Sequence, residues 1–261
     1  MVDPSNGGTF SPVRISEVPS FGPIAEYYDD LMGQVPYEMW ADYFELLLLT
    51  MEKSPKSMLD VCCGTGTVAE LMCKRGYEVS GIDLSEPMII EAQRKAAEMA
   101  FPIEYRACDA ANFDFGRQFD AAYSFFDSFN YITDLGHLEK AFLNIARHLP
   151  GGAPLIFDLN TPFAFEQKMF DQEDTRKKTT VKYKWRGDYD ARTRIIRVEM
   201  DFWVGDKEFK EVHVQRAHSR DEIFEALWRA GFENVMAYDS YTLDPPRKRS
   251  DRVHIACVRS S

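Results

Sequence analysis

The sequence predicts a doubly wound α/β fold with a mostly parallel sheet, into which a smaller antiparallel β-sheet is inserted. Two observations support this prediction. Apolar runs of strand length alternate with helical stretches from residue 57 to residue 160, and strict apolar–polar alternation occupies residues 181–214. Alternating strands and helices need crossover connections, which build a parallel sheet with helices on both faces. Strict alternation is instead typical of antiparallel strands with one buried face.

Composition and charge agree with one large α/β domain that carries an insertion. The 261 residues are 45% hydrophobic and 13% aromatic, enough for a sizeable core. The net charge of −11 repels polyanions, which argues against nucleic acid and anionic membranes as partners. Nowhere do about 18 uncharged apolar residues run together, and the leader has no apolar signal-peptide core. We therefore expect a cytoplasmic protein with a flexible leader over residues 1–20.

The first elements are a helix, a strand, a glycine turn and a second helix. Apolar residues recur at helical spacing over residues 37–51. An apolar run at residues 57–61 predicts a strand that leads directly into the turn Cys62-Cys63-Gly64-Thr65-Gly66. The helical stretch 67–74 follows, and Gly76 is a typical helix stop.

The same alternation continues up to residue 157. A strand at residues 77–82 ends at Asp83, and Ser85 is the expected N-cap of a helix that runs to about residue 99 with Pro87 in its first turn. Further apolar runs predict strands at residues 103–107, 119–124 and 154–157, and an amphipathic helix at 135–149 that ends at Pro150-Gly151-Gly152.

The pattern changes at Asn160. Gly187-Asp188 and Gly205-Asp206 are expected turns between the alternating runs of the insertion. Ser219 and Glu222 have the spacing of a capping box, at the start of a helix that Gly231 closes. Strands at residues 233–238 and 252–258 complete seven strands and flank a basic loop, 244–252, which we interpret as a solvated hairpin tip. The expected domains are a core of residues 21–160 and 215–261, and an insertion of residues 161–214 that covers the active-site crevice.

Acidic residues follow three of the predicted parallel strands: Asp60, Asp83 and Asp109. The binding crevice of such a sheet lies beyond the carboxyl ends of its strands, where Gly64 and Gly66 let backbone approach a ligand. The glycines alone would also suit a dinucleotide. Asp83 suits the two ribose hydroxyls of an adenosine ligand, whereas Asp60 would repel a pyrophosphate and attract a sulfonium and an ammonium group. The acids therefore favour S-adenosylmethionine.

Five motifs together resemble the ordered motif series of the class I S-adenosylmethionine-dependent methyltransferases. They are LDVCCGTG at residues 59–66, GIDLS at 81–85, CDA at 108–110, FDAAYSFFDSFNYI at 119–132 and AGFENV at 230–235. The resemblance spans roughly residues 27–258 and implies the Rossmann-like methyltransferase fold. The inserted sheet resembles that of small-molecule N-methyltransferases, including the glycine and amino-sugar types.

The resemblance also implies which residues bind the cofactor. They are Asp60, Cys62 and Gly64 for the methionine part, Asp83 for the ribose, Leu84, Met88, Asp109 and Ala110 for the adenine, and the aromatic residues Tyr28, Trp40 and Phe125. Tyr28 and Trp40 would close over the cofactor's carboxylate, although aromatic residues at that spacing are also ordinary core residues. Cys62 departs from the family, which usually has glycine there, so the geometry of the turn at this position is open.

Methyl transfer depends mainly on alignment and desolvation of the acceptor. By resemblance to amino-sugar enzymes, Asp127, Asn130 and Tyr131 face the acceptor, with Asp127 holding or deprotonating an amine. If the insertion folds over the crevice, His213 is a candidate base and Arg216 a candidate clamp for an acceptor carboxylate. The plainer interpretations are that Asp127 caps a turn, that Tyr131 packs in the core and that His213 lies on the surface.

The sequence thus predicts an S-adenosylmethionine-dependent methyltransferase that methylates a small-molecule acceptor, at an amine nitrogen, by in-line transfer. The five cysteines lack the second Cys/His cluster that a zinc site needs, so no metal is expected. The aromatic insertion would cover the substrate or form a homodimer contact. Two alternatives remain: an S-adenosylmethionine-binding interaction protein without catalysis, and an NAD-dependent oxidoreductase, whose catalytic residues we cannot identify.

Overall fold

The computed structural model describes residues 21–261, so the predicted leader at residues 1–20 lies outside the described residues. The central sheet consists of β1 (Ser57–Val61), β2 (Glu78–Asp83), β3 (Glu104–Ala107), β4 (Ala121–Ser124), β5 (Pro154–Asn160), β10 (Phe232–Asp239) and β11 (Arg252–Arg259). The helices are η1 (Ala25–Tyr27), α1 (Tyr28–Leu31), α2 (Tyr37–Thr50), α3 (Thr67–Lys74), α4 (Glu86–Glu98), η2 (Ser128–Tyr131), α5 (Leu135–Arg147), α6 (Pro162–Glu166) and α7 (Arg220–Arg229).

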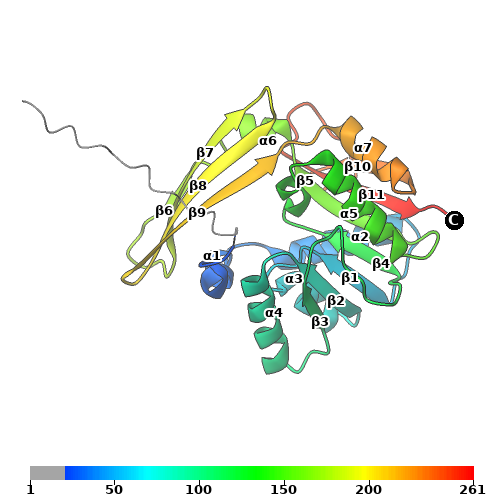
Figure 1. Cartoon of the computed structure of the whole chain (residues 1–261), viewed down its shortest axis with the longest axis horizontal. Helices are drawn as coiled ribbons and strands as arrows, with labels where there is room; N and C mark the ends of the chain where they lie inside the picture. The colour runs from blue at the N-terminus through cyan, green and yellow to red at the C-terminus, as the bar shows by residue number, and fades with distance from the viewer. Residues whose placement is uncertain (1–20) are drawn as a thin grey trace, which may run out of the picture.

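The strand order of the central sheet is β10-β11-β5-β4-β1-β2-β3 (Figure 1). Strands β1 to β5 are parallel, and β11 runs antiparallel to both of its neighbours. The chain therefore starts at the centre, moves outward to β3, and returns to β4 on the other side of β1. The predicted doubly wound, mostly parallel seven-stranded sheet is confirmed. The reversal of direction beside β1 is where such folds bind ligands.

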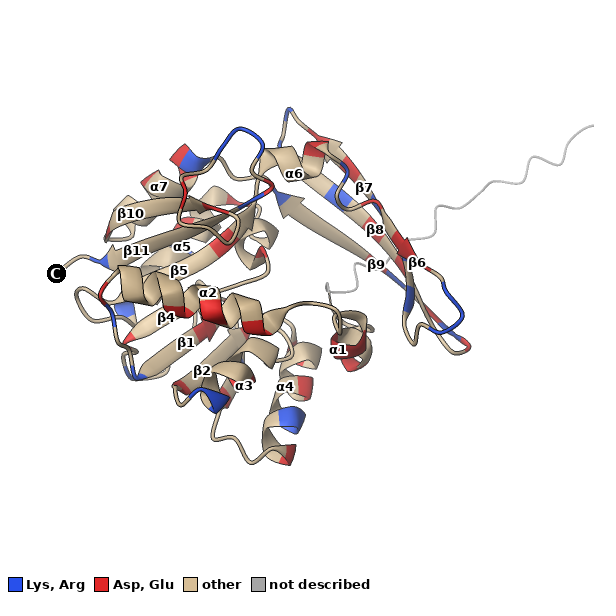
Figure 2. Cartoon of the chain, turned by 180° about the vertical axis from the view of Figure 1, so that it is seen from behind, with Lys and Arg blue, Asp and Glu red and all other residues tan. Residues whose placement is uncertain are grey.

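Helices cover both faces of the sheet. Met58 of β1 packs into a cluster with residues of α2, α3 and α4, and the next residue, Leu59, packs into a cluster with residues of α5 and α7. Successive residues of a strand point to opposite faces, so a strand buried on both faces reads as a continuous apolar run. In Figure 1 α5 and α7 lie in front of the sheet, and Figure 2 shows α2 from the other side.

The insertion forms a second, antiparallel sheet that projects from the core (Figure 1). Its strands, in spatial order, are β6 (Gln172–Asp174), β7 (Lys182–Asp190), β8 (Ile195–Val204) and β9 (Lys207–Arg216). Ile196, Val198 and Met200 of β8 are buried and form the centre of an apolar cluster with Phe165 of α6 and Ile24. The alternation in the sequence thus marks one buried face of a real sheet.

One of the two predicted hairpin turns is wrong. Gly187 and Asp188 lie inside β7, and the chain turns instead at residues 191–194, where Arg194 has a φ of 59°. Gly187 is needed for packing, because a Cβ there would lie 3.0 Å from Cδ1 of Ile196. The turn at Gly205 is confirmed by its φ of 57°, and so is the capping box that starts α7.

Charged residues of both signs are spread over the described elements (Figure 2). The first two α-helices are acidic: α1 contains Asp29 and Asp30, and α2 contains three acidic residues and no basic one. Among the helices of residues 21–261, none is long and apolar enough to cross a membrane.

Candidate active site

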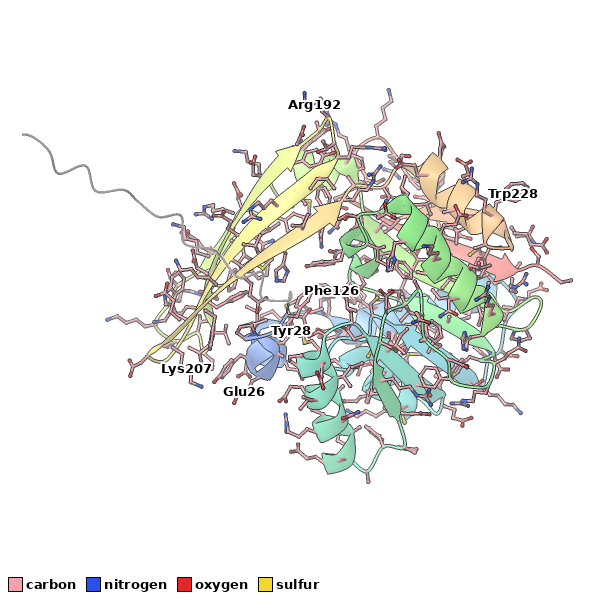
Figure 3. All side chains as sticks on the ribbon, in the orientation of Figure 1. Glu26, Tyr28, Phe126, Arg192, Lys207 and Trp228 are labelled. Atoms are coloured by element: carbon pink, nitrogen blue, oxygen red, sulfur yellow. The ribbon has the colours of Figure 1, made fainter. Side chains whose placement is uncertain are left out.

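A cavity of about 1280 Å³ lies at the carboxyl ends of β1, β2 and β4, and β8 and β9 form its opposite wall. Tyr28 and Phe126 lie in this region, between the core and the projecting sheet, whereas Trp228 lies on the far side of the core (Figure 3). All eleven residues predicted to bind the cofactor line this one cavity. Of the five residues predicted to serve the acceptor, Asp127, Tyr131 and His213 line it as well.

The turn after β1 brings backbone to the cavity wall. Cys62, Gly64 and Gly66 have φ values of 61°, 55° and 79°, in the left-handed region. A Cβ on Gly64 would meet nothing within 4 Å, whereas a Cβ on Gly66 would collide with the ring of Tyr105. Gly64 therefore keeps space free for a ligand, and Gly66 allows close packing behind the turn. Burial, aided by the nearby Asp83 and Asp60, raises the pKa of the Cys62 thiol, so this residue is a neutral thiol.

Asp60, the fourth residue of β1, is buried with one oxygen unpaired. Its side chain is 3% exposed, and Oδ2 has no hydrogen-bond partner among the described residues. Burial raises the pKa of the Asp60 carboxyl, and the neighbouring Tyr123 hydroxyl acts in the opposite direction. A buried carboxylate oxygen without a partner is costly unless a ligand supplies a donor.

Asp83, at the end of β2, holds the glycine turn and the start of α4 together. Its Oδ2 accepts from the backbone N–H of Gly64 at 2.9 Å, and its Oδ1 accepts from that of Ser85 at 2.8 Å. Burial raises the pKa of this carboxyl, while the backbone donors oppose the shift. Beyond it, Leu84 is 75% exposed and Met88 is buried, and both line the cavity.

Asp109, after β3, is paired with a histidine that sequence reasoning missed. The Nε2 atom of His137 lies 3.0 and 2.9 Å from the two carboxylate oxygens, and the N–H of Ala111 donates to Oδ1 at 2.8 Å. His137 reaches this position because Asp134 caps α5 by accepting from its N–H. In the sequence, the spacing of Asp134 and His137 at the start of a predicted helix could have indicated this position.

Aromatic residues from distant segments form another wall of the cavity. Trp40 of α2 contacts Phe126 with 4.8 Å between ring centroids, and Tyr28 contacts Phe21 edge-on at 5.7 Å. Phe125 is buried against Phe44. Burial raises the pKa of the Tyr28 hydroxyl, so it stays protonated and can donate a hydrogen bond.

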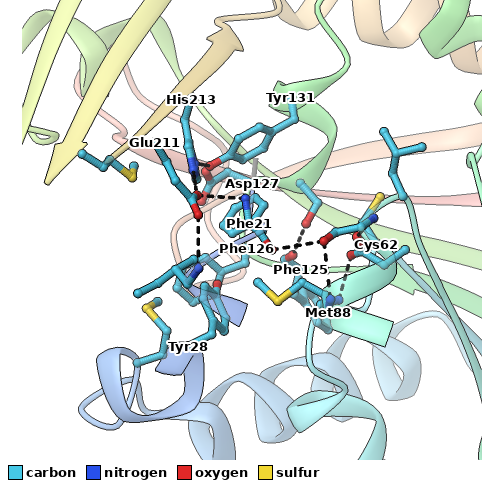
Figure 4. Close-up of a pocket in the computed structure, with 18 of the residues that line it drawn as sticks. Phe21, Tyr28, Cys62, Met88, Phe125, Phe126, Asp127, Tyr131, Glu211 and His213 are labelled. Atoms are coloured by element: carbon cyan, nitrogen blue, oxygen red, sulfur yellow. Dashed lines mark hydrogen bonds and ion pairs between the residues drawn. The ribbon is translucent and has the colours of Figure 1, made fainter. Parts of the chain in front are cut away.

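A hydrogen-bonded chain of three side chains ends at the wall formed by the insertion. The Tyr131 hydroxyl lies 2.9 Å from Nδ1 of His213, and Nε2 of His213 lies 2.8 Å from Oε2 of Glu211 (Figure 4). Because a carboxylate only accepts, Nε2 carries the proton and Nδ1 accepts from the tyrosine. His213 is 1% exposed, so the alternative of a surface histidine is wrong. Glu211 was missed, although its spacing of two residues puts it on the same face of β9 as His213.

Asp127 lies beside this chain in a strained backbone conformation. Phe126 and Asp127 have φ values of 72° and 49°. The Asp127 carboxylate accepts from Nε2 of Gln215 and from Nη2 of Arg252, both at 2.8 Å. Arg252 also pairs with Asp158 and lines the cavity. Arg252 is the last residue of the loop predicted to be solvated and the first of the last predicted strand. It therefore lies in the wall of the site, a position that nothing in the sequence pattern indicated.

Asn130 and Arg216, predicted to contact the acceptor, do not line the cavity. Asn130 is fully buried, and its amide bonds the backbone of Asn160 and the carbonyl of Arg216. The Arg216 side chain pairs with Glu222 of the α7 capping box at 3.0 Å. Both residues connect the core to the insertion. Within residues 21–261, no group of three or more His, Cys, Asp and Glu side chains is placed to hold a metal ion.

Comparison with known proteins places this site in a family. The family model described as a methyltransferase domain matches residues 58–152. The putative methyltransferase YqeM of Bacillus subtilis is 30% identical over 241 residues, which cover 90% of this chain and 96% of that protein. The dTDP-3-amino-3,4,6-trideoxy-alpha-D-glucopyranose N,N-dimethyltransferase of Streptomyces venezuelae is 27% identical over 202 residues, covering 73% and 82%.

A solved structure agrees over nearly the whole chain. An S-adenosylmethionine-dependent methyltransferase from Clostridium acetobutylicum has a TM-score of 0.80 and 26% identity, over 91% of this chain and 98% of that one. These matches favour a methyltransferase over the NAD-dependent oxidoreductase and over a binding protein without catalysis. This chain belongs to the class I S-adenosylmethionine-dependent methyltransferases, and S-adenosylmethionine is its cofactor.

Proposed function

We propose that this methyltransferase acts on an amine nitrogen of a small molecule. The observation that carries the proposal is the chain Tyr131–His213–Glu211, which reaches the cavity beside Asp127. An imidazole that accepts from a hydroxyl and donates to a carboxylate is arranged to take up a proton and to be stabilised once charged. We call the part of the cavity lined by these four residues the acceptor end.

The residues at the other end of the cavity fit the cofactor, which when bound supplies a methyl group activated by a sulfonium. The unpaired oxygen of Asp60 offers an acceptor for its ammonium group, and Gly64 leaves room where a Cβ would stand. A carboxylate has about four lone-pair sites, so Asp83 can accept from ribose hydroxyls as well as from backbone. The proposed contacts are Asp60, Cys62 and Gly64 at the methionine end, Asp83 at the ribose, Leu84, Met88, Asp109 and Ala110 at the adenine, and Tyr28, Trp40 and Phe125 as covering side chains.

The charges at the acceptor end favour a cationic acceptor. Asp127 and Glu211 are buried there, 6% and 3% exposed. Arg252 also lines this end, but it is paired with two carboxylates, Asp127 and Asp158, so together with Glu211 the cluster keeps a net negative charge. Buried carboxylates attract a cation, and an amine is cationic near neutral pH.

Proton chemistry also separates an amine from a hydroxyl. An alkylammonium, with a reference pKa of about 10.4, gives up its proton far more readily than a hydroxyl as weakly acidic as water. The amine proton goes to the Tyr131 oxygen, the tyrosine proton goes to Nδ1 of His213, and Glu211 balances the imidazolium. This relay is therefore better matched to an amine than to an alcohol.

One of the relatives supports nitrogen as the target, since its name describes N,N-dimethylation of an amino sugar linked to a nucleotide. The acidic cavity of this chain is poorly suited to a diphosphate. We therefore propose methylation at nitrogen for this chain, but not a nucleotide-linked substrate.

The test is a screen of small primary and secondary amines, each paired with the alcohol of the same carbon skeleton, with S-adenosylmethionine as donor and mass spectrometry of the product. We expect the amine of a pair to gain a methyl group and the alcohol to remain unchanged. Tyr131→Phe should lower kcat by about 100-fold, which is the lower end of the contribution that general base catalysis makes. The affinity for the cofactor, measured by calorimetry, should be unchanged. Tyr183→Phe, on the insertion but outside the cavity lining, is the matched control. Methylation of the alcohols, or full activity of Tyr131→Phe, would contradict the proposal.

A further inference from the structure

Glu211 bonds two parts of the molecule that are far apart in the chain. Its Oε2 accepts from the backbone N–H of Phe21 at 2.9 Å and from His213, and its Oε1 accepts from the N–H of Ile24 at 3.2 Å. The residue is 3% exposed, so these bonds are largely shielded from solvent. One buried carboxylate thus holds the candidate base and the segment that begins at Phe21.

The segment Phe21 to Tyr28 covers the acceptor end. The Phe21 ring contacts His213 at 4.5 Å and Tyr131 at 5.4 Å between ring centroids. On the cofactor side, the Ser85 hydroxyl donates to the Phe21 carbonyl at 3.2 Å, and Ser85 is itself bonded to Asp83. Phe21 therefore lies between the two ends of the cavity and contacts both (Figure 4).

We propose that Glu211 is a positioning residue that couples docking of the segment Phe21–Tyr28 to assembly of the Tyr131–His213 relay. This inference rests on the proposed function for its catalytic consequence, but not for its structural content. With the segment docked, the negative charge of Glu211 fixes the proton of His213 on Nε2 and leaves Nδ1 free to accept from Tyr131. With the segment released, Glu211 and His213 lose the cover of Phe21, and water competes for both ring nitrogens.

The electrostatic surroundings make Glu211 the group that selects this arrangement. Tyr131 at the end of η2, Asp127 just before η2 and Tyr28 of α1 are titratable groups near the imidazole. Asp127 is already held by Gln215 and Arg252, and burial raises the pKa of both tyrosines, which keeps them neutral. Glu211 is therefore the anion in contact with the imidazole.

Two variants of Glu211 separate its two roles. In Glu211→Gln the amide oxygen takes the place of Oε1 and still accepts from the N–H of Ile24. The amide nitrogen takes the place of Oε2, so it loses the bond from Phe21, donates to Nε2 of His213 and moves the ring proton to Nδ1. In Glu211→Ala neither bond remains. Glu208→Gln is the matched control, because Glu208 lies on the same strand with its side chain half exposed and paired only with Lys210.

The experiment combines ¹⁵N NMR of the histidine rings, amide hydrogen exchange of Phe21 and Ile24, and kcat on an amine substrate. For Glu211→Gln we expect the His213 proton on Nδ1, retained protection of the Ile24 amide, reduced protection of the Phe21 amide, unchanged cofactor affinity and kcat lower by about 100-fold. For Glu211→Ala we expect protection of both amides to be lost and kcat to fall as well. Glu208→Gln should match the wild type in all three measurements.

The coupling is overturned if Glu211→Ala leaves both amides protected, or if Glu211→Gln leaves the proton on Nε2. The NMR and exchange measurements need no acceptor, so they decide the coupling even if no amine is methylated. If the tautomer and protection changes occur as expected but no amine is methylated, the proposed function is rejected and the coupling stands.

Discussion

At the scale of single residues, the glycine turn contains a residue that is not glycine. Cys62 has a φ of 61°, which costs a non-glycine residue about 1–2 kcal/mol. Its side chain packs against the apolar cluster of β1, β4 and α5, which offsets part of this cost. The sequence departs from the usual family pattern here, but the structure keeps the backbone conformation that a glycine would adopt.

Substitutions at Cys62 should therefore separate conformational strain from packing. Cys62→Gly should change the free energy of unfolding by less than about 1 kcal/mol, since relief of strain is offset by lost packing and by the greater freedom of the unfolded chain. Cys62→Val should lose about 2 kcal/mol or more and bind the cofactor weakly, because a β-branched residue does not tolerate positive φ. Urea unfolding and calorimetry measure both effects. Equal stability of the two variants would show that the turn is not strained.

At the scale of elements, the start of α7 is the joint between the insertion and the core. Glu222 completes the capping box with Ser219 and accepts from Arg194 at 2.6 Å and Arg216 at 3.0 Å, both at the base of the projecting sheet. Burial acts to raise the pKa of Glu222, but the bonds from Ser219 and the arginines outweigh it and lower the pKa to about 2. The ionised carboxylate therefore stabilises the folded state.

The stabilisation by Glu222 should depend on pH in a defined direction. The pKa in the unfolded chain is about 4.3, so the contribution is complete above that pH and is lost as pH falls through about 2. Glu222→Gln should lower the free energy of unfolding near pH 7 by about 1 kcal/mol, because Gln keeps the capping box but loses the charge-assisted bonds from Arg194 and Arg216, and the difference from the wild type should shrink in acid. Denaturant unfolding at several pH values measures it. Glu225→Gln, exposed on the same helix, is the control, and a difference that does not vary with pH would refute the assignment.

At the scale of the whole molecule, the site lies between two sheets that come from different parts of the chain. The cavity is larger than the usual range of about 300–1,000 Å³ for a single ligand, so it has room for a cofactor and an acceptor. The expectations of no nucleic-acid or membrane partner, of a homodimer contact through the insertion and of a cytoplasmic location stay predictions.

Cofactor binding should stabilise the whole fold. S-adenosylmethionine or S-adenosylhomocysteine at 100 times its Kd should raise the free energy of unfolding by about 2.7 kcal/mol, and NAD should have no effect. Asp83→Asn should lose most of this gain, because the amide accepts fewer hydrogen bonds than the carboxylate that we propose binds the ribose. Thermal unfolding with each ligand measures the gain, with Asp206→Asn at the exposed hairpin turn as control. Stabilisation by NAD instead would contradict the assignment of Asp60, Asp83 and Asp109 to an S-adenosylmethionine site.

The sequence by itself determined the order and type of the core elements and the cofactor end of the cavity. Strand and helix periodicities are local, and parallel strands bring their carboxyl ends to one edge, so Asp60, Asp83 and Asp109 could be placed together without a structure. Short elements such as α6 and β6 could not be predicted, because they span too few residues to show a period.

Only the tertiary structure decided the acceptor end. Tyr131 and His213 are 82 residues apart, and Asp127 and Arg252 are 125 apart, and they meet because the insertion and the last strand return to the same edge of the sheet. Asn130 and Arg216 are sequence neighbours of these residues, yet their side chains turn to the backbone and to Glu222. Periodicity reports which face of an element is buried, whereas the partner of a buried polar group depends on long-range packing that no local pattern contains.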